Sequence, residues 1–151
     1  MKTSIRGVEI AHFQAHPDAR GFFCEILRNR RAWPRFQLSH SRVKQGVEKG
    51  WHGHRRQSQL TYFASGKFLL VALDFRRGSK TFGRHIRLMA MPRALSRWHI
   101  ITEPGILIYY QCLAPGEVIY VTSGTYDPAE ELRVPPREVL PWYRTHGQSF
   151  R

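Results

Sequence analysis

Residues 46–66 have the sequence GVEKGWHGHRRQSQLTYFASG, and this stretch decides the fold class. His52 and His54 are two positions apart, so their side chains point to the same face of an extended strand. An apolar segment starts at Leu60, turns at Ser65-Gly66 and continues as a second apolar segment over 67–74. A His-Gly-His pair next to two such strands predicts the ligand-holding wall of a β-barrel.

Short segments with strand composition recur along the rest of the chain, separated by Gly and Pro turns. They are residues 4–14, 22–27, 36–43, 84–91, 98–105, 106–113 and 118–122. About nine short strands without a long amphipathic helix are typical of an all-β sandwich or barrel. We expect one domain over residues 1–151, with a Pro-rich tail at 128–151 that forms loops and one helical turn near 129–132.

The protein carries 24 Lys and Arg against 11 Asp and Glu, a formal net charge of +13 at pH 7. This charge favours an anionic partner such as a nucleotide. The basic residues are dispersed over many segments, so charge alone supports a nucleic-acid role only weakly, and we expect no nucleic-acid partner.

The sequence also bears on the compartment. No run approaches the roughly 18 apolar residues that span a bilayer, and the first ten residues lack the apolar stretch of a secretory signal. Cys24 and Cys112 are far apart, each in apolar surroundings, which favours reduced thiols. We therefore expect a cytoplasmic protein that does not associate with membranes.

Several further segments form an ordered set along the chain: DARGFFCE at 18–25, FQLSHS at 36–41, GWH at 50–52, ALDFRRGSKTFG at 72–83, EVIY at 117–120 and YDP at 126–128. In this order they resemble the dTDP-4-dehydrorhamnose 3,5-epimerase family of cupins, over roughly residues 7 to 130. The resemblance implies a cupin fold, a double-stranded β-helix jelly-roll barrel. It also implies a homodimer whose early strands cross to the partner, and no metal or organic cofactor.

The resemblance further implies a substrate and a chemistry. The substrate is a nucleotide-diphosphate 4-keto-6-deoxy sugar, with dTDP as the expected nucleotide, and epimerisation or isomerisation proceeds by proton abstraction next to the ketone. A histidine suits the base, and a tyrosine hydroxyl suits the acid on the opposite face. By position, the catalytic residues are His52 as base, Tyr120 as acid and Asp74 beside them. The substrate-binding residues are Arg20, Phe23 and Glu25 for the nucleotide, Gln37 and Lys49 for the diphosphate and nucleobase, and His54 and Gln59.

Two features depart from the family pattern. Gln59 stands where the family has a lysine that stabilises the enolate, and such an oxyanion donor contributes about 3–4 kcal/mol. The family also has an aspartate that orients the base histidine, and the matching segments of this sequence contain no counterpart of it. The carboxylates that could replace it are Glu25, Asp74, Glu130 and Glu131.

Two alternative functions therefore stay open. One is a sugar-nucleotide-binding cupin with impaired catalysis. The other is a metal-dependent cupin enzyme that uses His52 and His54, because two histidines on one face can bind Fe, Mn or Ni. Their spacing to Gln59 fits the general cupin metal motif, with the amide in the place of a glutamate, and His99 is the nearest candidate for a third histidine.

Overall fold

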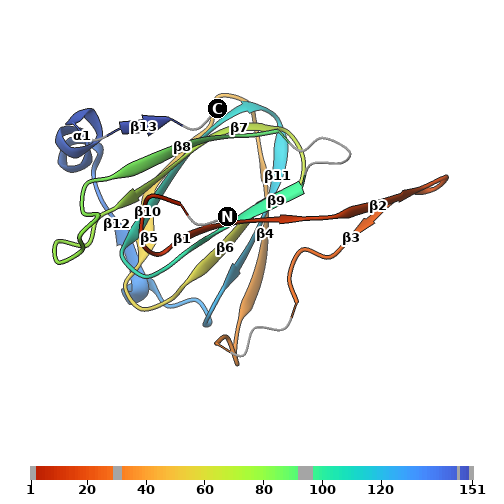
Figure 1. The fold of residues 1–151 in the computed structure, drawn as a ribbon, viewed down its shortest axis with the longest axis horizontal. Coiled ribbons are helices and arrows are strands. Elements are labelled where there is room, and N and C mark those ends of the chain that lie inside the picture. The colour runs from red at the N-terminus through yellow and green to blue at the C-terminus, as the bar shows by residue number, and fades with distance from the viewer. Residues whose placement is uncertain (1–2, 29–31, 92–96, 146, 150–151) are drawn as a thin grey trace.

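The computed structural model describes residues 3–28, 32–91, 97–145 and 147–149. Over these residues strands predominate, and the helical elements lie in the C-terminal part (Figure 1). The strands are β1 (Val8–Phe13), β2 (Ala15–Asp18), β3 (Gly21–Cys24), β4 (Gln37–Val43), β5 (Glu48–His54), β6 (Gln59–Phe63), β7 (Lys67–Asp74), β8 (His85–Ala90), β9 (Arg97–Thr102), β10 (Ile106–Ala114), β11 (Gly116–Thr122), β12 (Glu131–Arg133) and β13 (Gly147–Ser149). The helical elements are the 3₁₀ helix η1 (Pro128–Glu130) and the α-helix α1 (Pro136–Thr145).

Eleven of the thirteen strands in the described residues form two sheets that close on each other as a barrel (Figure 1). One sheet has the order β1-β9-β6-β11-β4, and the other has the order β12-β5-β10-β7-β8-β13. Every pairing in these sheets is antiparallel except that of β13 with β8. This arrangement confirms the predicted all-β barrel.

The core follows from the alternation of side chains along each strand. On β7, Leu70 and Ala72 belong to the apolar cluster inside the barrel. Val71 and Leu73 point to the outer face of the same sheet, where Val139 of α1 covers them. The helix therefore explains why side chains on both faces of β7 are buried.

The C-terminal part corrects the prediction of a loop-rich tail. A helical turn is present at η1, but residues 131–133 then form strand β12, and α1 follows at 136–145. The prolines favoured loops in the sequence-based prediction. Pro136 nevertheless occupies the first helical position, where a backbone N–H would make no intrahelical hydrogen bond in any case. Residues 146, 150 and 151 of the predicted tail lie outside the described residues.

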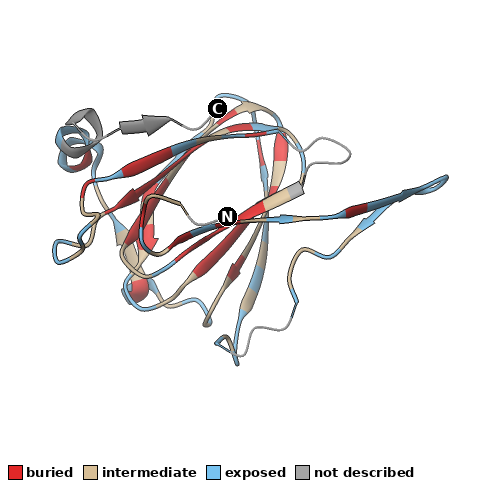
Figure 2. Ribbon diagram, viewed as in Figure 1, coloured by how far each residue is buried: buried red, intermediate tan, exposed pale blue. Residues whose placement is uncertain are grey.

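Strands β2 and β3 form a hairpin of their own that extends away from the barrel (Figure 1). The strand predicted at 22–27 is β3 at 21–24 in the structure. The hairpin is largely exposed (Figure 2), and 69% of Phe23 is accessible to solvent.

Candidate active site

A cavity of about 780 Å³ lies between the two sheets. Its volume falls within the roughly 300–1,000 Å³ of small-molecule sites. The lining comes from strands β4, β5, β6, β11 and β12, from Gln57 between β5 and β6, and from the segments after β11 and β12. Of the residues predicted from sequence, Gln37, Lys49, His52, His54, Gln59 and Tyr120 line this cavity.

The His-Gly-His motif lies on β5 as predicted, with both histidines lining the cavity. Between them, Gly53 is buried where β5 passes close to β10. A Cβ atom at this position would lie 2.2 Å from the carbonyl oxygen of Ile106, so a larger residue would push the two segments apart. The glycine therefore lets both imidazoles face the cavity on a strand that packs tightly against its neighbour.

His52 is held in its neutral form. Burial, the repulsion from His54, and the cations Lys49 and Arg133 lower the pKa of His52 to about 4, while Glu131 acts in the opposite direction. At pH 7 the imidazole is therefore unprotonated and has a nitrogen lone pair free to take a proton.

His54 and Gln59 form a hydrogen-bonded chain. Gln59 is 5% exposed, and its Nε2 donates to Thr61 Oγ1 at 3.0 Å. Its Oε1 therefore accepts from His54 Nε2, at 2.9 Å. This pairing puts a proton on Nε2 of His54, and the buried Nδ1 of the same ring has no hydrogen-bond partner in the described residues.

Tyr120 reaches the cavity from β11, on the sheet opposite β5. Its hydroxyl lies 2.5 Å from the hydroxyl of Tyr110. Burial raises the pKa of Tyr120, whereas hydrogen bonds with Tyr110 and Ser41 lower it. The phenol is therefore protonated at neutral pH and can donate a proton into the cavity.

Gln37 is anchored at the mouth of the cavity. Its Oε1 accepts from the backbone N–H of Tyr126 at 2.7 Å, and its Nε2 donates to Ser39 Oγ at 3.1 Å. The predicted residues Gln37 and Lys49 thus lie with the histidines, as expected for groups that contact one ligand.

Arg20, Phe23 and Glu25 do not line the cavity of their own chain. They lie on or beside the projecting β2–β3 hairpin. Arg20 pairs with Asp18 at 2.6 Å, and Glu25 pairs with Arg28 at 2.7 Å. The contribution of these residues to a nucleotide site of this chain stays a prediction.

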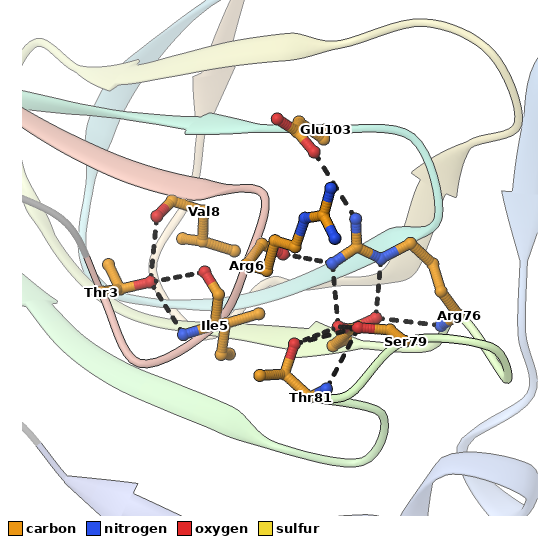
Figure 3. Close-up of polar contacts among 9 residues, drawn as sticks. Thr3, Ile5, Arg6, Val8, Arg76, Ser79, Thr81 and Glu103 are labelled. Carbon is orange, nitrogen blue, oxygen red and sulfur yellow. Dashed lines mark hydrogen bonds and ion pairs between the residues drawn. The ribbon is translucent and has the colours of Figure 1, made fainter.

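Asp74 also lies outside the cavity lining, although sequence had placed it beside the catalytic pair. Its fully buried carboxylate accepts hydrogen bonds from Arg76, from Ser79 Oγ and from Thr81 Oγ1, in the network of Figure 3. Burial alone would raise the pKa of Asp74, but these hydrogen bonds outweigh it and lower the pKa to about 2. Arg76 in turn bonds to the carbonyl of Arg6, so the carboxylate joins the β7–β8 loop to the N-terminal segment (Figure 3).

Asp74→Asn is therefore expected to reduce the free energy of unfolding by about 3 kcal/mol, because it leaves Arg76 without its buried partner. The folded-state pKa is below the usual 3.8, so the carboxylate stabilises the fold above that value, and this contribution is lost as pH falls through about 2. Denaturant unfolding between pH 7 and pH 2 measures both effects, with the exposed Asp18→Asn as the control. Unchanged stability together with lost activity would place Asp74 in catalysis instead.

Of the candidate carboxylates, Glu131 is the one that reaches the cavity. Glu130 is buried and pairs with Arg56 at 2.5 Å. Glu131 lies directly opposite His54 in the β12–β5 pairing, and Arg133 lies opposite His52. Glu131 and Arg133 also pair with each other at 2.7 Å. The negative charge that acts on His52 therefore comes from β12, a strand that sequence analysis missed.

Other residues of the site were missed. Ser39 and Ser41 lie on β4 with Gln37 and also line the cavity. Arg133 was missed because a strand of only three residues before a Pro-Pro pair has no recognisable sequence pattern. Tyr110, which is not among the lining residues, was missed because it lies within an apolar strand and only the fold brings its hydroxyl to that of Tyr120.

Two further observations concern other classes of function. In residues 3–28, 32–91, 97–145 and 147–149, no three His, Cys, Asp or Glu side chains are grouped as ligands of one metal ion. Over the same residues, no helix has the length and apolar character of a membrane span.

The hollow antiparallel barrel, with a polar cavity between an imidazole and a phenol on facing sheets, defines the class of cupin-type proteins with an internal ligand site. Comparison with known proteins narrows this class. The family model described as dTDP-4-dehydrorhamnose 3,5-epimerase matches residues 2–140. The chain therefore belongs to the dTDP-4-dehydrorhamnose 3,5-epimerase family, and the resemblance found in the sequence is confirmed.

Individual relatives agree with this assignment. The spore coat polysaccharide biosynthesis protein SpsL of Bacillus subtilis is 31% identical over 143 residues, which are 91% of this chain and 90% of that protein. A dTDP-4-dehydrorhamnose 3,5-epimerase of Salmonella typhimurium is 33% identical over 142 residues, which are 87% of this chain and 76% of that enzyme. The crystal structure of a Legionella pneumophila 3,5-epimerase in complex with dTDP-4-keto-L-rhamnose has a TM-score of 0.80 at 25% identity, covering 99% of this chain and 86% of that one.

Proposed function

We propose that the cavity binds a dTDP-linked 4-keto-6-deoxy sugar and that the protein epimerises a carbon next to the ketone. One observation carries the proposal: in a member of an epimerase family, a neutral histidine and a protonated tyrosine line one cavity from facing sheets. A base and an acid on opposite sides of a sugar ring are what inversion of a carbon centre requires.

His52 is the base in this mechanism. The 4-keto group acidifies the hydrogens on C3 and C5, and the neutral imidazole takes one of them, which leaves an enolate. A bound diphosphate brings negative charge into the cavity and raises the pKa of His52 from about 4 toward the operating pH. Tyr120 then returns a proton to the opposite face of the carbon.

The positive charges of the cavity serve the anionic parts of the substrate. Lys49 and Arg133 line the cavity near His52, and both lower its pKa through their charge. Gln59 is neutral and already bonds to His54 and Thr61, so the enolate receives less stabilisation here than from a lysine. We assign Lys49 and Arg133 to the diphosphate and the enolate.

The test is to incubate the protein with dTDP-4-keto-6-deoxyglucose in D₂O and to follow C3 and C5 of the sugar by NMR. The proposal predicts deuterium at one or both carbons and the appearance of an epimer. A ligand that binds tightly, as seen by a shift of the unfolding temperature, but never exchanges would select a sugar-nucleotide-binding protein without catalysis.

Glu131 provides a prediction on pH dependence. Because the pKa of His52 is about 4, the base is competent above that pH, and kcat/KM is expected to fall only on acidification toward about pH 4. Glu131→Gln removes the charge that raises this pKa, so the base becomes weaker and the rate at pH 7 is expected to fall by about threefold to tenfold. pH–rate profiles check both statements, with Glu117→Gln as the control, because Glu117 is a half-buried glutamate that is not among the cavity-lining residues. Identical profiles for Glu131→Gln and wild type would refute the influence of Glu131.

We further propose a homodimer in which the β2–β3 hairpin of one protomer packs on the other. Phe22 and Phe23 on this hairpin are 48% and 69% exposed, and Phe36 and Leu38 at the edge strand β4 are 60% and 65% exposed. Apolar surfaces of this kind mark protein–protein contacts. This packing of the hairpin on the partner would bring Arg20, Phe23 and Glu25 to the part of the partner's cavity that binds the nucleotide.

The double variant Phe22→Ser/Phe23→Ser is expected to shift the protein from dimer to monomer, because it removes the apolar part of the contact. Light scattering after size-exclusion chromatography gives the mass directly. Met89→Ser/Met91→Ser, at exposed positions away from the hairpin, is the control. A wild-type monomer, or a dimer that survives the hairpin substitutions, would contradict this arrangement.

A further inference from the structure

Tyr110 is a fully buried tyrosine of the barrel interior. Its ring meets the rings of Phe63 and Phe68 edge-on, with centroid distances of 5.7 Å in both cases and interplanar angles of 89° and 85°. Two edge-to-face contacts with neighbouring phenylalanine rings restrain the plane of the Tyr110 ring. The hydroxyl of Tyr110 consequently has a defined position, which is within 2.5 Å of the hydroxyl of Tyr120.

The direction of this hydrogen bond follows from the chemistry of the pair. Each phenol has one hydrogen, and Tyr120 must point its own into the cavity if it is to donate a proton there. Tyr110 is therefore the donor and the oxygen of Tyr120 is the acceptor. The pKa shifts agree, because burial and then the contact with Tyr120 raise the pKa of Tyr110, whereas the contact with Tyr110 lowers the pKa of Tyr120.

We infer that Tyr110 is a positioning residue: it donates a hydrogen bond to the Tyr120 hydroxyl, directs the Tyr120 hydrogen into the cavity and stabilises the phenolate that proton transfer leaves behind. This inference rests on the proposed function. In the step concerned, the O–H bond of Tyr120 breaks and its proton forms a new C–H bond at the enolate carbon. The electron pair of the enolate enters that bond as the carbonyl re-forms, and Tyr120 is left as a phenolate.

The phenolate is stabilised in the manner of an oxyanion hole, in which donors already point at the place where charge develops. Tyr110 provides one donor, and Ser41 on β4, whose contact also lowers the pKa of Tyr120, provides the other. A proton returns to the phenolate from solvent or from the His52 imidazolium, which closes the cycle with protons conserved.

Other charged groups share the cavity with Tyr120 and belong in any account of its titration. Glu48, Lys49, His52 and His54 on β5 and Glu131 and Arg133 on β12 lie on the opposite wall. Tyr126 and Asp127 follow β11. A substitution at Tyr110 leaves all of these unchanged, so a change in the titration of Tyr120 reports on the hydrogen bond.

Tyr110→Phe is the decisive variant, because it keeps the ring packed against Phe63 and Phe68 and deletes one hydroxyl. In protein labelled with ¹³C at the tyrosine Cζ, the NMR titration of Tyr120 is expected to move up by about one pH unit, since a hydrogen bond to a charged group contributes about 1.5–3 kcal/mol. With a 4-keto sugar nucleotide, kcat is expected to fall about tenfold with KM unchanged. In the Tyr120→Phe background, Tyr110→Phe is expected to cause no further loss.

An unchanged titration of Tyr120 in Tyr110→Phe, or losses of kcat that add up in the double variant, would overturn the inference and make Tyr110 a packing residue. The titration is measured without turnover. If the pKa of Tyr120 shifts in Tyr110→Phe but the protein never exchanges the hydrogens of the sugar with solvent, the hydrogen bond stands and only the proposed reaction is rejected.

Discussion

His52→Ala is expected to reduce both epimerisation and solvent-deuterium incorporation about a thousandfold, because it removes the imidazole that takes the hydrogen from the sugar. General acid–base groups typically contribute factors of 10² to 10⁴. The loss should appear in kcat, since His52 acts on the reacting hydrogen and Lys49 and Arg133 remain to bind the diphosphate. NMR in D₂O measures exchange and inversion in the same sample.

His40→Ala is the matched control, because His40 is an exposed histidine on β4 beside Glu117. It should leave the rate unchanged. His54→Ala is informative in addition, since it frees the buried amide of Gln59 and should lower the rate less than His52→Ala. Full exchange in His52→Ala would remove this residue from the mechanism.

Tyr120→Phe is expected to separate the two half-reactions. Inversion should fall about a hundredfold, because the phenol that returns the proton to the opposite face is gone. Exchange should continue, since His52 still removes a hydrogen, exchanges it with solvent and returns deuterium to the same face. The diagnostic product is therefore a deuterated sugar with its original configuration.

Tyr62→Phe provides the comparison, because Tyr62 is a buried tyrosine in the apolar cluster on the outer face of the sheet that contains β11. It should retain both exchange and inversion. Equal loss of exchange and inversion in Tyr120→Phe would instead give Tyr120 a part in binding or in the first proton abstraction.

The part of the site that sequence predicted depends on local spacing. His52 and His54 are two residues apart on one strand. Because side chains alternate between the two faces of a strand, this spacing was enough to place both on the same face. Gln37, Lys49 and Tyr120 were placed by the resemblance to the epimerase family, and the structure brings them to the same cavity. The barrel itself followed from short apolar segments separated by Gly and Pro.

The part that sequence did not predict depends on contacts distant along the chain. Strand β12 is three residues long and exists because it pairs with β5, which brings Glu131 and Arg133 beside the histidines. Helix α1 was hidden by its prolines and forms where Val139 covers the outer face of β7 and β10. Asp74 lies in a segment that resembles the family, but only the fold shows that its carboxylate accepts hydrogen bonds from Arg76, Ser79 and Thr81.

The arrangement of the sugar between His52 and Tyr120 is tested most directly by a crystal structure with a non-reacting dTDP-sugar, such as dTDP-rhamnose, in which the 4-ketone is reduced. The account predicts the pyranose ring inside the barrel, with one carbon adjacent to C4 facing the His52 imidazole and its opposite face toward the Tyr120 hydroxyl. A sugar bound on the outer surface of the barrel, or one with both residues on the same side of its ring, would contradict it.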